Sequence, residues 1–519
     1  MPGISQYGDL NLAAQVLPDL RVIIVPPQNR LINGVPTNRM GVVGTASWGP
    51  VNQPAIVGDY PGYVRTFGPL RARRYDMGTH VATAVQQGAQ DFRCVRVTDG
   101  TDAAAQLELA AGALLLVALY SGTVGNTIRA GLSAGSRPGT FRLTVGVAGQ
   151  VPEVFDNIGG TGAAFWGALA AAVNTGSGVL RGPSHLVIAV AEGGAVAPVA
   201  VPPGALAGGT DGAAGVTQAM LTGLDGTTRT GMYALRGQGC SLMVVSDCDD
   251  ATQWTTQAGY CQAECMYPIV CGPSGDTIAN AIATKQGAGA DFYALKVLFG
   301  DWLYWNDPQN QQLRVVSPQG FVAGRLANLS PEQSSGNKPL FGVVASQRSG
   351  APGSGQAATY SDAELTALVQ AGIDVVVNPV PGGSYWGVRF GRNASSDAGT
   401  HGDNYTRLTN FIAKTLLAGM GRYVQEVVNG TLLDRIRATQ LEFLMALFGQ
   451  SILSSVDGTL PFSVVCDTSN NPPERLGLGY AASYAQVRYG PIADFINLEL
   501  EGGQTVQITS RQTLPAGQA

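Results

Sequence analysis

The chain has 519 residues, a formal net charge of −5, only 13% charged residues and 70 glycines. Its length predicts three or four domains, and its negative charge argues against a basic surface for nucleic acid or an anionic membrane. Charged residues at about half, and glycine at about twice, their usual share indicate many turns and close contacts. Two explanations stay open, namely a protein that packs against copies of itself and an ordinary turn-rich β protein.

The N-terminus has neither the basic nor the apolar segment of a signal peptide. The longest apolar run, within 107–120, is too short to span a membrane. We therefore expect the protein to be made and folded in a cytoplasm.

The first 100 residues predict an arm followed by the start of an α/β core. Residues 1–20 are rich in Pro and Gly and indicate an extended N-terminal arm. A β–α–β order follows, which predicts a core domain over 21–100 that resumes over 210–345. Its first expected elements are strands at 21–25, 38–45 and 92–97 and a helix at 76–88.

The segment 101–209 differs from its surroundings, because Gly and Pro separate short apolar runs and only 161–174 has a helical pattern. This predicts an inserted β-rich domain, which we expect on the outside of any assembly. The core pattern then returns, with expected strands at 241–245, 267–271, 294–299 and 302–305 and helices at 249–265 and 276–286.

A Gly/Ser-rich stretch at 346–358 predicts a linker, and a C-terminal α/β domain is expected over 346–490. Ser361 can cap a helix that ends at Gly372. A strand is expected at 373–378, and longer helices at 403–417 and 432–449. The predicted fold class is therefore a multidomain α/β (α+β) protein with an inserted β-rich domain and strand-like arms at both ends.

The last segment, 491–519, alternates apolar and polar residues on both sides of Gly502–Gly503. Two interpretations stay open, namely a hairpin within the chain and an arm donated to another subunit. The side chains that would face inward are Ile496, Leu498 and Leu500 before the glycines, and Val506 and Ile508 after them.

The search for catalytic chemistry is mostly negative. The sequence has no P-loop and no H-E-x-x-H motif, and only three histidines. Gly131–Gly135 matches G-x-S-x-G, which would make Ser133 the nucleophile of an α/β hydrolase, but Pro138 and Gly139 follow where a helix is required. We therefore expect no enzyme activity and no cofactor, with the Ser133 hydrolase as the distant alternative.

The cysteines leave three interpretations open: buried thiols, which the pattern favours, disulfides, and a zinc site. Their odd number would leave one thiol for a bridge between subunits that oxidises after release. The seven residues are Cys94, Cys240, Cys248, Cys261, Cys265, Cys271 and Cys466.

Residues 22–68 resemble the contractile bacteriophage tail sheath family through a G-x-x-G-x-A-x-x-G-P segment at 41–50. Four further pieces follow in the family's order: Gly125-Asn126 before Ile128, L-A-G-G-T-D-G at 206–212, S-P-Q-G-F-V-A-G at 317–324, and G-I-D at 372–374 with W-G-V-R at 386–389. Ser317 and Gln319 depart from the family pattern.

The resemblance implies a subunit that polymerises helically around a tail tube and contracts to drive the tube through a host envelope for genome ejection. Its arms would add strands to the C-terminal domains of neighbouring copies. The expected partners are the protein itself, the tube protein, and the baseplate and terminator proteins, in a virion tail assembled in the host cytoplasm.

On this resemblance, Val22 and Ile24 belong to the first strand near the N-terminal arm, and Arg435 and Arg437 are candidate contacts to the tube. A solvated helix face explains both arginines equally well. The alternatives are the sheath of a bacteriocin or secretion-type injection system, and a capsid or tube protein.

Overall fold

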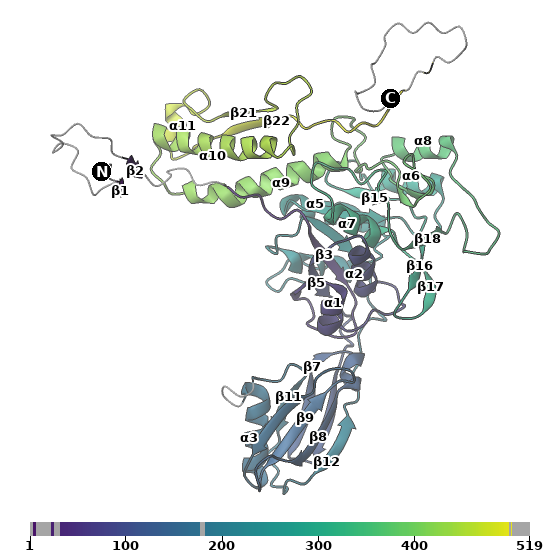
Figure 1. The fold of residues 1–519 in the computed structure, drawn as a ribbon, viewed down its shortest axis with the longest axis vertical. Helices are drawn as coiled ribbons and strands as arrows, with labels where there is room; N and C mark the ends of the chain where they lie inside the picture. The colour runs from purple at the N-terminus through teal and green to yellow at the C-terminus, as the bar shows by residue number, and fades with distance from the viewer. Residues whose placement is uncertain (1–3, 7–21, 25–31, 177–181, 498–499, 501–519) are drawn as a thin grey trace, which may run out of the picture.

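The structure is a computed structural model that describes residues 32–176, 182–497 and 500, together with the backbone of 4–6 and 22–24. Three parts follow one another along its long axis (Figure 1). The insert lies at one end, an α/β core lies in the middle, and a layer containing two long helices lies at the other end. The predicted mixed α/β class is confirmed.

The core is built on a six-stranded sheet with the order β15-β14-β13-β3-β5-β4, parallel except for β4. Its central strands are buried on both faces, which explains their unbroken apolar sequences. β13 pairs with β3 in parallel, so strands from before and after the insert lie side by side in this sheet. The strands are β3 (Arg39–Gly44), β4 (Pro54–Val57), β5 (Asp91–Arg96), β13 (Leu242–Val245), β14 (Tyr267–Cys271) and β15 (Lys296–Leu298).

The helices of the core include a tightly packed pair, α2 and α7. A Cβ at Gly320 would lie 2.3 Å from the Thr83 hydroxyl, and one at Gly324 would lie 2.4 Å from the Ala84 Cα. The two glycines of the S-P-Q-G-F-V-A-G segment therefore permit close helix contact. The core helices are α1 (Tyr60–Phe67), α2 (Met77–Gln86), α4 (Gln218–Thr222), α5 (Trp254–Ala263), α6 (Ile278–Gly287) and α7 (Gln319–Ala327).

The insert contains two antiparallel sheets and one helix, α3 (Gly162–Thr175), around a separate hydrophobic cluster. One sheet has the order β10-β9-β8-β12 and the other β11-β7-β6. The strands are β6 (Ala104–Ala110), β7 (Leu114–Ser121), β8 (Arg129–Ala134), β9 (Phe141–Gly146), β10 (Glu153–Ile158), β11 (Val187–Ala191) and β12 (Val201–Ala205).

Two of the motif segments meet where the insert joins the core. The Asn126 side chain donates to the Gly209 carbonyl (2.9 Å) and accepts from the Gly209 amide (2.8 Å). The buried Arg96 guanidinium donates to three backbone carbonyls there, those of Gly49, Ser121 and Asp211. The motif residues Asn126 and Gly209 therefore help to hold the insert to the core.

Residues 303–400 continue the core. Leu368 and Ile373 share a hydrophobic cluster with Val270 and Leu295, so this cluster crosses residue 346, where the sequence predicted a new domain. The chain directly after G-I-D lies beside W-G-V-R, because Arg389 N–H donates to the Val375 carbonyl (2.9 Å) and β19 pairs with β20. The elements are β16 (Leu303–Asp307), β17 (Gln312–Val316), β18 (Val343–Ser346), α8 (Asp362–Gln370), β19 (Val376–Val377) and β20 (Gly387–Val388).

The last part consists of α9 and α10 with a two-stranded sheet against them (Figure 1). Phe411 of α9, Phe443 of α10 and Phe462 of β21 share its hydrophobic cluster. The elements are α9 (Asp403–Met420), α10 (Gly430–Gly449), β21 (Phe462–Val465), α11 (Pro473–Gly477) and β22 (Tyr484–Val487).

All seven cysteines are free thiols, so the disulfide interpretation is wrong within the subunit; Cys265 is half-buried and the others are buried: Cys94, Cys240, Cys248, Cys261, Cys271 and Cys466. Burial raises the pKa of Cys240 to about 11, so this thiol stays protonated and unreactive at neutral pH. Within the described ranges, no group of His, Cys, Asp or Glu is arranged to hold a metal ion, and no helix is long and apolar enough to cross a membrane.

Candidate functional site

The two-stranded sheet of β21 and β22 has unpaired backbone groups on both edges. The strands are antiparallel, with Phe462 opposite Val487 and Val464 opposite Ala485. Arg488 N–H donates to the Pro461 carbonyl (2.7 Å), which fixes the alternation of bonded and non-bonded pairs. By that alternation, the N–H and C=O groups of Phe462 and Val464, and of Ala485 and Val487, point outward. None of these groups has a hydrogen-bond partner in the described part of the chain.

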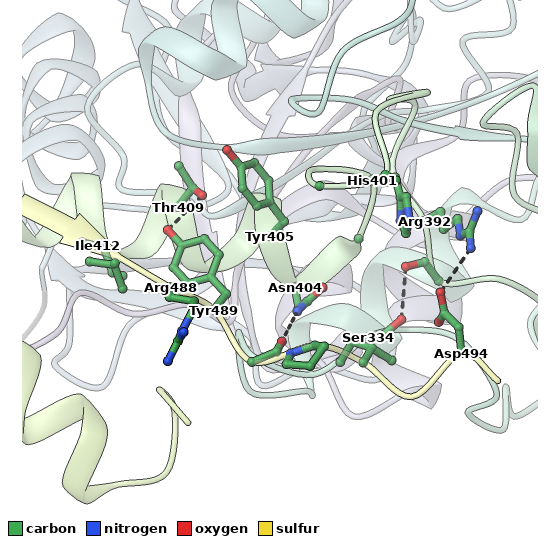
Figure 2. A pocket seen from close by; sticks show the side chains of 18 of the residues that line it. Ser334, Arg392, His401, Asn404, Tyr405, Thr409, Ile412, Arg488, Tyr489 and Asp494 are labelled. Carbon is green, nitrogen blue, oxygen red and sulfur yellow. Dashed lines mark hydrogen bonds and ion pairs between the residues drawn. The ribbon is translucent and has the colours of Figure 1, made fainter. Parts of the chain in front are cut away.

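A groove of about 820 Å³ runs along the open edge of β22 (Figure 2). Ala485 and Val487 line it together with Ile412 and Leu416 of α9. A strand added to β22 would lie about 4.8 Å from it. The groove therefore combines open backbone groups with apolar side chains, which are the two features by which sheet edges bind extended peptides.

The chain that follows β22 is held to the rest of the molecule by side-chain contacts as far as Asp494. The Tyr489 and Thr409 hydroxyls lie 3.0 Å apart, Asn404 Nδ2 donates to the Gly490 carbonyl (3.4 Å), and Asp494 pairs with Arg392 (3.1 Å) (Figure 2).

Beyond Asp494, the large apolar side chains of the described residues are exposed to solvent. Phe495, Ile496 and Leu500 are 86%, 77% and 94% exposed. Residues 491–497 and 500 belong to no strand, so the described part forms no hairpin of its own. Leu498, Val506 and Ile508 lie outside the described residues, as do the side chains of Val22 and Ile24. The backbone of Val22–Ile24 forms β2, which pairs in parallel with β1 (Ile4–Gln6) of the same chain.

More than half of the large apolar residues that are exposed in the described part of the molecule lie within 417–500. A concentration of this kind marks a surface that another molecule covers. The residues are Leu417, Val424, Val427, Met445, Val456, Leu460, Leu478, Tyr480, Tyr484, Ile492, Phe495, Ile496 and Leu500.

The groove is joined to the core by a buried cluster of three charges. Lys296 Nζ of β15 lies 2.7 Å from an oxygen of Asp374 and 3.1 Å from an oxygen of Asp403, the first residue of α9. All three side chains are fully buried. Tyr267 of β14 also donates to Asp403 (2.6 Å), as does Ser335.

The charges in this cluster stabilise one another. Burial acts to raise the pKa of Asp403, but Lys296 and the hydroxyls of Ser335 and Tyr267 outweigh it, so the pKa lies below its usual value. Burial likewise acts to lower the pKa of Lys296, and Asp374 and Asp403 raise it above its usual value. The start of α9 is thus held to the core sheet by ion pairs that favour the charged forms of Lys296 and Asp403.

The two arginines predicted to contact a tube lie on α10. Arg435 pairs with Glu426 (2.7 Å) and its guanidinium lies 5.3 Å from the centre of the Tyr423 ring. Arg437 is exposed. The structure gives both arginines ordinary surface positions, and their predicted contact to a tube stays a prediction.

Ser133 does not occupy a nucleophile elbow. It lies in β8, opposite Arg142 of the antiparallel strand β9. A nucleophile elbow is a sharp strand-to-helix turn, and β8 is instead an inner strand of an antiparallel sheet, so the match to G-x-S-x-G is coincidental.

Sequence reasoning did not find β21 and β22, the strands that form the open sheet. Each has only four residues, and no element was expected between 450 and 490. The alternation of Phe462 and Val464 with Ser463 was the available signal.

No family model and no curated protein sequence matches the chain. Solved structures do. The sheath tail protein of Listeria innocua is 14% identical, with a TM-score of 0.59 over 86% of this chain and 91% of its own. That of Desulfitobacterium hafniense is 15% identical, with a TM-score of 0.56 over 86% and 93%. The helical sheath of the anti-feeding prophage in its contracted state is 10% identical, with a TM-score of 0.54 over 94% and 100%. The chain has the fold of the contractile sheath proteins.

Proposed function

We propose that this chain is the subunit of a contractile phage tail sheath, which polymerises helically around a tail tube and shortens to drive the tube through a cell envelope. The observation that carries the proposal is the combination of an open β22 edge and an exposed apolar arm that begins at Phe495. Each copy can donate its arm as a strand and accept the arm of another copy at its β22 edge. Such a head-to-tail contact builds a helical filament when the rotation between copies does not close into a ring.

The energy of such a joint follows from its parts. Ala485 and Val487 offer two N–H and two C=O groups, so an added strand gains up to about four hydrogen bonds of roughly 0.5–1.5 kcal/mol each. Burial of each large apolar side chain of the arm adds roughly 1.5–3 kcal/mol. Ordering a free arm costs part of this gain. A backbone joint of this strength holds copies together while the rigid bodies on either side rotate.

A second candidate is the sheath of a related contractile injection system. The match to the anti-feeding prophage sheath, which extends over 94% of this chain, supports it. Isolation of the particle separates the two candidates. A DNA-filled head attached to the sheathed tube indicates a phage tail, and a headless particle indicates an injection system. In either case, baseplate and tube proteins are the proposed partners and no catalytic role is assigned.

The proposal is tested by closing the edge or removing the arm. Ala485→Pro removes an outward N–H but none of the bonds between β21 and β22, and Ala481→Pro, just outside β22, is the matched control. Full-length protein and the control should form tubes or polysheaths in negative-stain micrographs. The Ala485→Pro variant and the chain lacking 495–519 should stay folded and fail to polymerise. Tubes formed equally well without the arm would refute strand donation.

A further inference from the structure

The outer strands of the insert are all closed to pairing, in contrast to β21 and β22. On β12, Pro202 and Pro203 lack N–H groups and coincide with a shift of register. On β10, the register shifts beside Asn157, whose φ is 62°. The outer side of β6 is covered, because Gln106 and Ala207 exchange two backbone hydrogen bonds.

The remaining outer strand, β11, is closed by one side chain from α3. Asn174 Nδ2 donates to the Ala189 carbonyl (2.8 Å), and Asn174 Oδ1 accepts from the Ala189 amide (2.9 Å). One amide side chain thus satisfies both backbone groups of Ala189, as the peptide group of a neighbouring strand would. Two residues earlier, the Val187 amide donates to the Ser184 hydroxyl (3.1 Å).

Without the hydrogen bonds from Asn174, β11 would be an exposed edge strand that favours pairing with another chain. Its sequence, V-I-A-V-A, contains neither a charge nor a proline. Ile188 and Val190 are 42% and 45% exposed, and they stand opposite the half-buried Val117 and Leu115 of β7. Two copies that paired their β11 strands antiparallel would join these apolar faces into one surface through a two-fold contact.

We propose that Asn174 determines which sheet edges can pair between copies, because it closes the β11 edge and leaves pairing to the C-terminal sheet. The proposal rests on the proposed function in one respect, which is that copies of this chain assemble by strand pairing at high local concentration. The partner that Asn174 excludes is β11 of a second copy.

The test uses the full chain carrying Ala485→Pro, so that the C-terminal edge does not contribute. Three variants are compared in this background: Asn174→Ala, Asn174→Asp, and Thr175→Ala as the control, since the Thr175 hydroxyl bonds only within α3. Sedimentation velocity over a range of concentrations measures association, and hydrogen exchange of the 187–191 peptide reports on the edge itself.

Asn174→Ala should associate as concentration rises, while Thr175→Ala stays at the sedimentation coefficient of the parent. In dilute solution the Ala189 amide of Asn174→Ala should exchange roughly tenfold faster than in the parent, and pairing should slow it again at high concentration. Asn174→Asp should stay dissociated, because a charge also blocks an edge.

Asn174→Ala that sediments like Thr175→Ala at every concentration would overturn the proposal. So would equal association of Asn174→Ala and Asn174→Asp, because a general loss of packing would then be the cause. Hydrogen exchange of the 187–191 peptide reports on β11 alone. A failure of the Asn174 proposal is therefore distinguishable from a failure of strand donation at β22.

Discussion

Replacing Lys296 by Met should destabilise the subunit by an amount that the buried charge cluster sets. The change removes the donor that lies 2.7 Å from Asp374 and 3.1 Å from Asp403, and it leaves two carboxylates facing each other in a fully buried site. Removing one partner of a buried ion pair costs about 3–5 kcal/mol. Asp374 keeps backbone donors from Val375 and Arg392, and Asp403 keeps Tyr267, so we expect about 4 kcal/mol.

The pH dependence of this loss is more diagnostic than its size. In the parent, the pKa of Asp403 is lowered, so its contribution is present above the ordinary aspartate pKa and is lost as pH falls through the lower pKa of the folded state. In Lys296→Met, burial and the facing carboxylate raise the pKa of one aspartate. The free energy of unfolding should then increase as pH falls from 7 to 5, whereas the contribution of this cluster in the parent stays constant over that range.

The assay is urea denaturation of the chain lacking 495–519 at pH 5 and pH 7, with hydrogen exchange of α9 as a local measure. Lys285→Met is the matched control, because the buried Lys285 donates to the Ala394 carbonyl (2.8 Å) and its loss leaves no pair of carboxylates behind. Equal losses in the two variants, with no difference between the two pH values, would refute the assignment of the cluster as an ionised link between core and groove.

Two further predictions concern other parts of the molecule. Burial raises the pKa of Asp76, the N-cap of α2, to about 6 despite Arg73 and Thr79, so the parent should lose stability relative to Asp76→Asn as pH rises from 4 to 6, by at most about 3 kcal/mol. Parallel denaturation curves at pH 4 and pH 7 measure this difference, and a constant difference would contradict it. Asn126→Ala removes both hydrogen bonds to Gly209 and should lower the stability of the junction by roughly 2 kcal/mol. Faster proteolysis at 206–212 would measure this loss. Unchanged cleavage would show that the junction does not depend on this pair.

The core could be predicted from sequence because its strands are buried on both faces. The strand expected at 267–271 is β14, residue for residue, and the strand expected at 38–45 is β3 with one residue fewer at each end. The helix expected at 76–88 begins at Met77 because Asp76 accepts a hydrogen bond from the Thr79 amide (2.9 Å). Unbroken apolar runs and a capping residue are local signals, so the neighbouring residues in the sequence were enough to predict these elements.

Other elements depend on contacts that no local pattern contains. The helix expected at 249–265 begins only at Trp254, because Asp250 caps a short 3₁₀ turn before it. The strand expected at 373–378 is assigned only at Val376–Val377, although the Asp374 backbone also forms a parallel bridge with Leu298 of β15. The Asp374 carboxylate accepts from Lys296 and from the amides of Phe390 and Arg392. The three charges of that cluster come from separate elements, and only the fold brings them together.

Hydrophobicity alone would favour strand pairing at the insert and not at the C-terminal sheet, where we propose it. β11, with V-I-A-V-A, has a higher β propensity than Y-A-Q-V of β22, and an isolated peptide of the β11 sequence should self-associate more readily. In the folded chain this order is reversed. Asn174 satisfies both backbone groups of Ala189, while the outward groups of Ala485 and Val487 have no partner in the described chain and face a groove. Since an unpaired backbone group gains most from a new strand, the pairing site is set by which groups the fold leaves open.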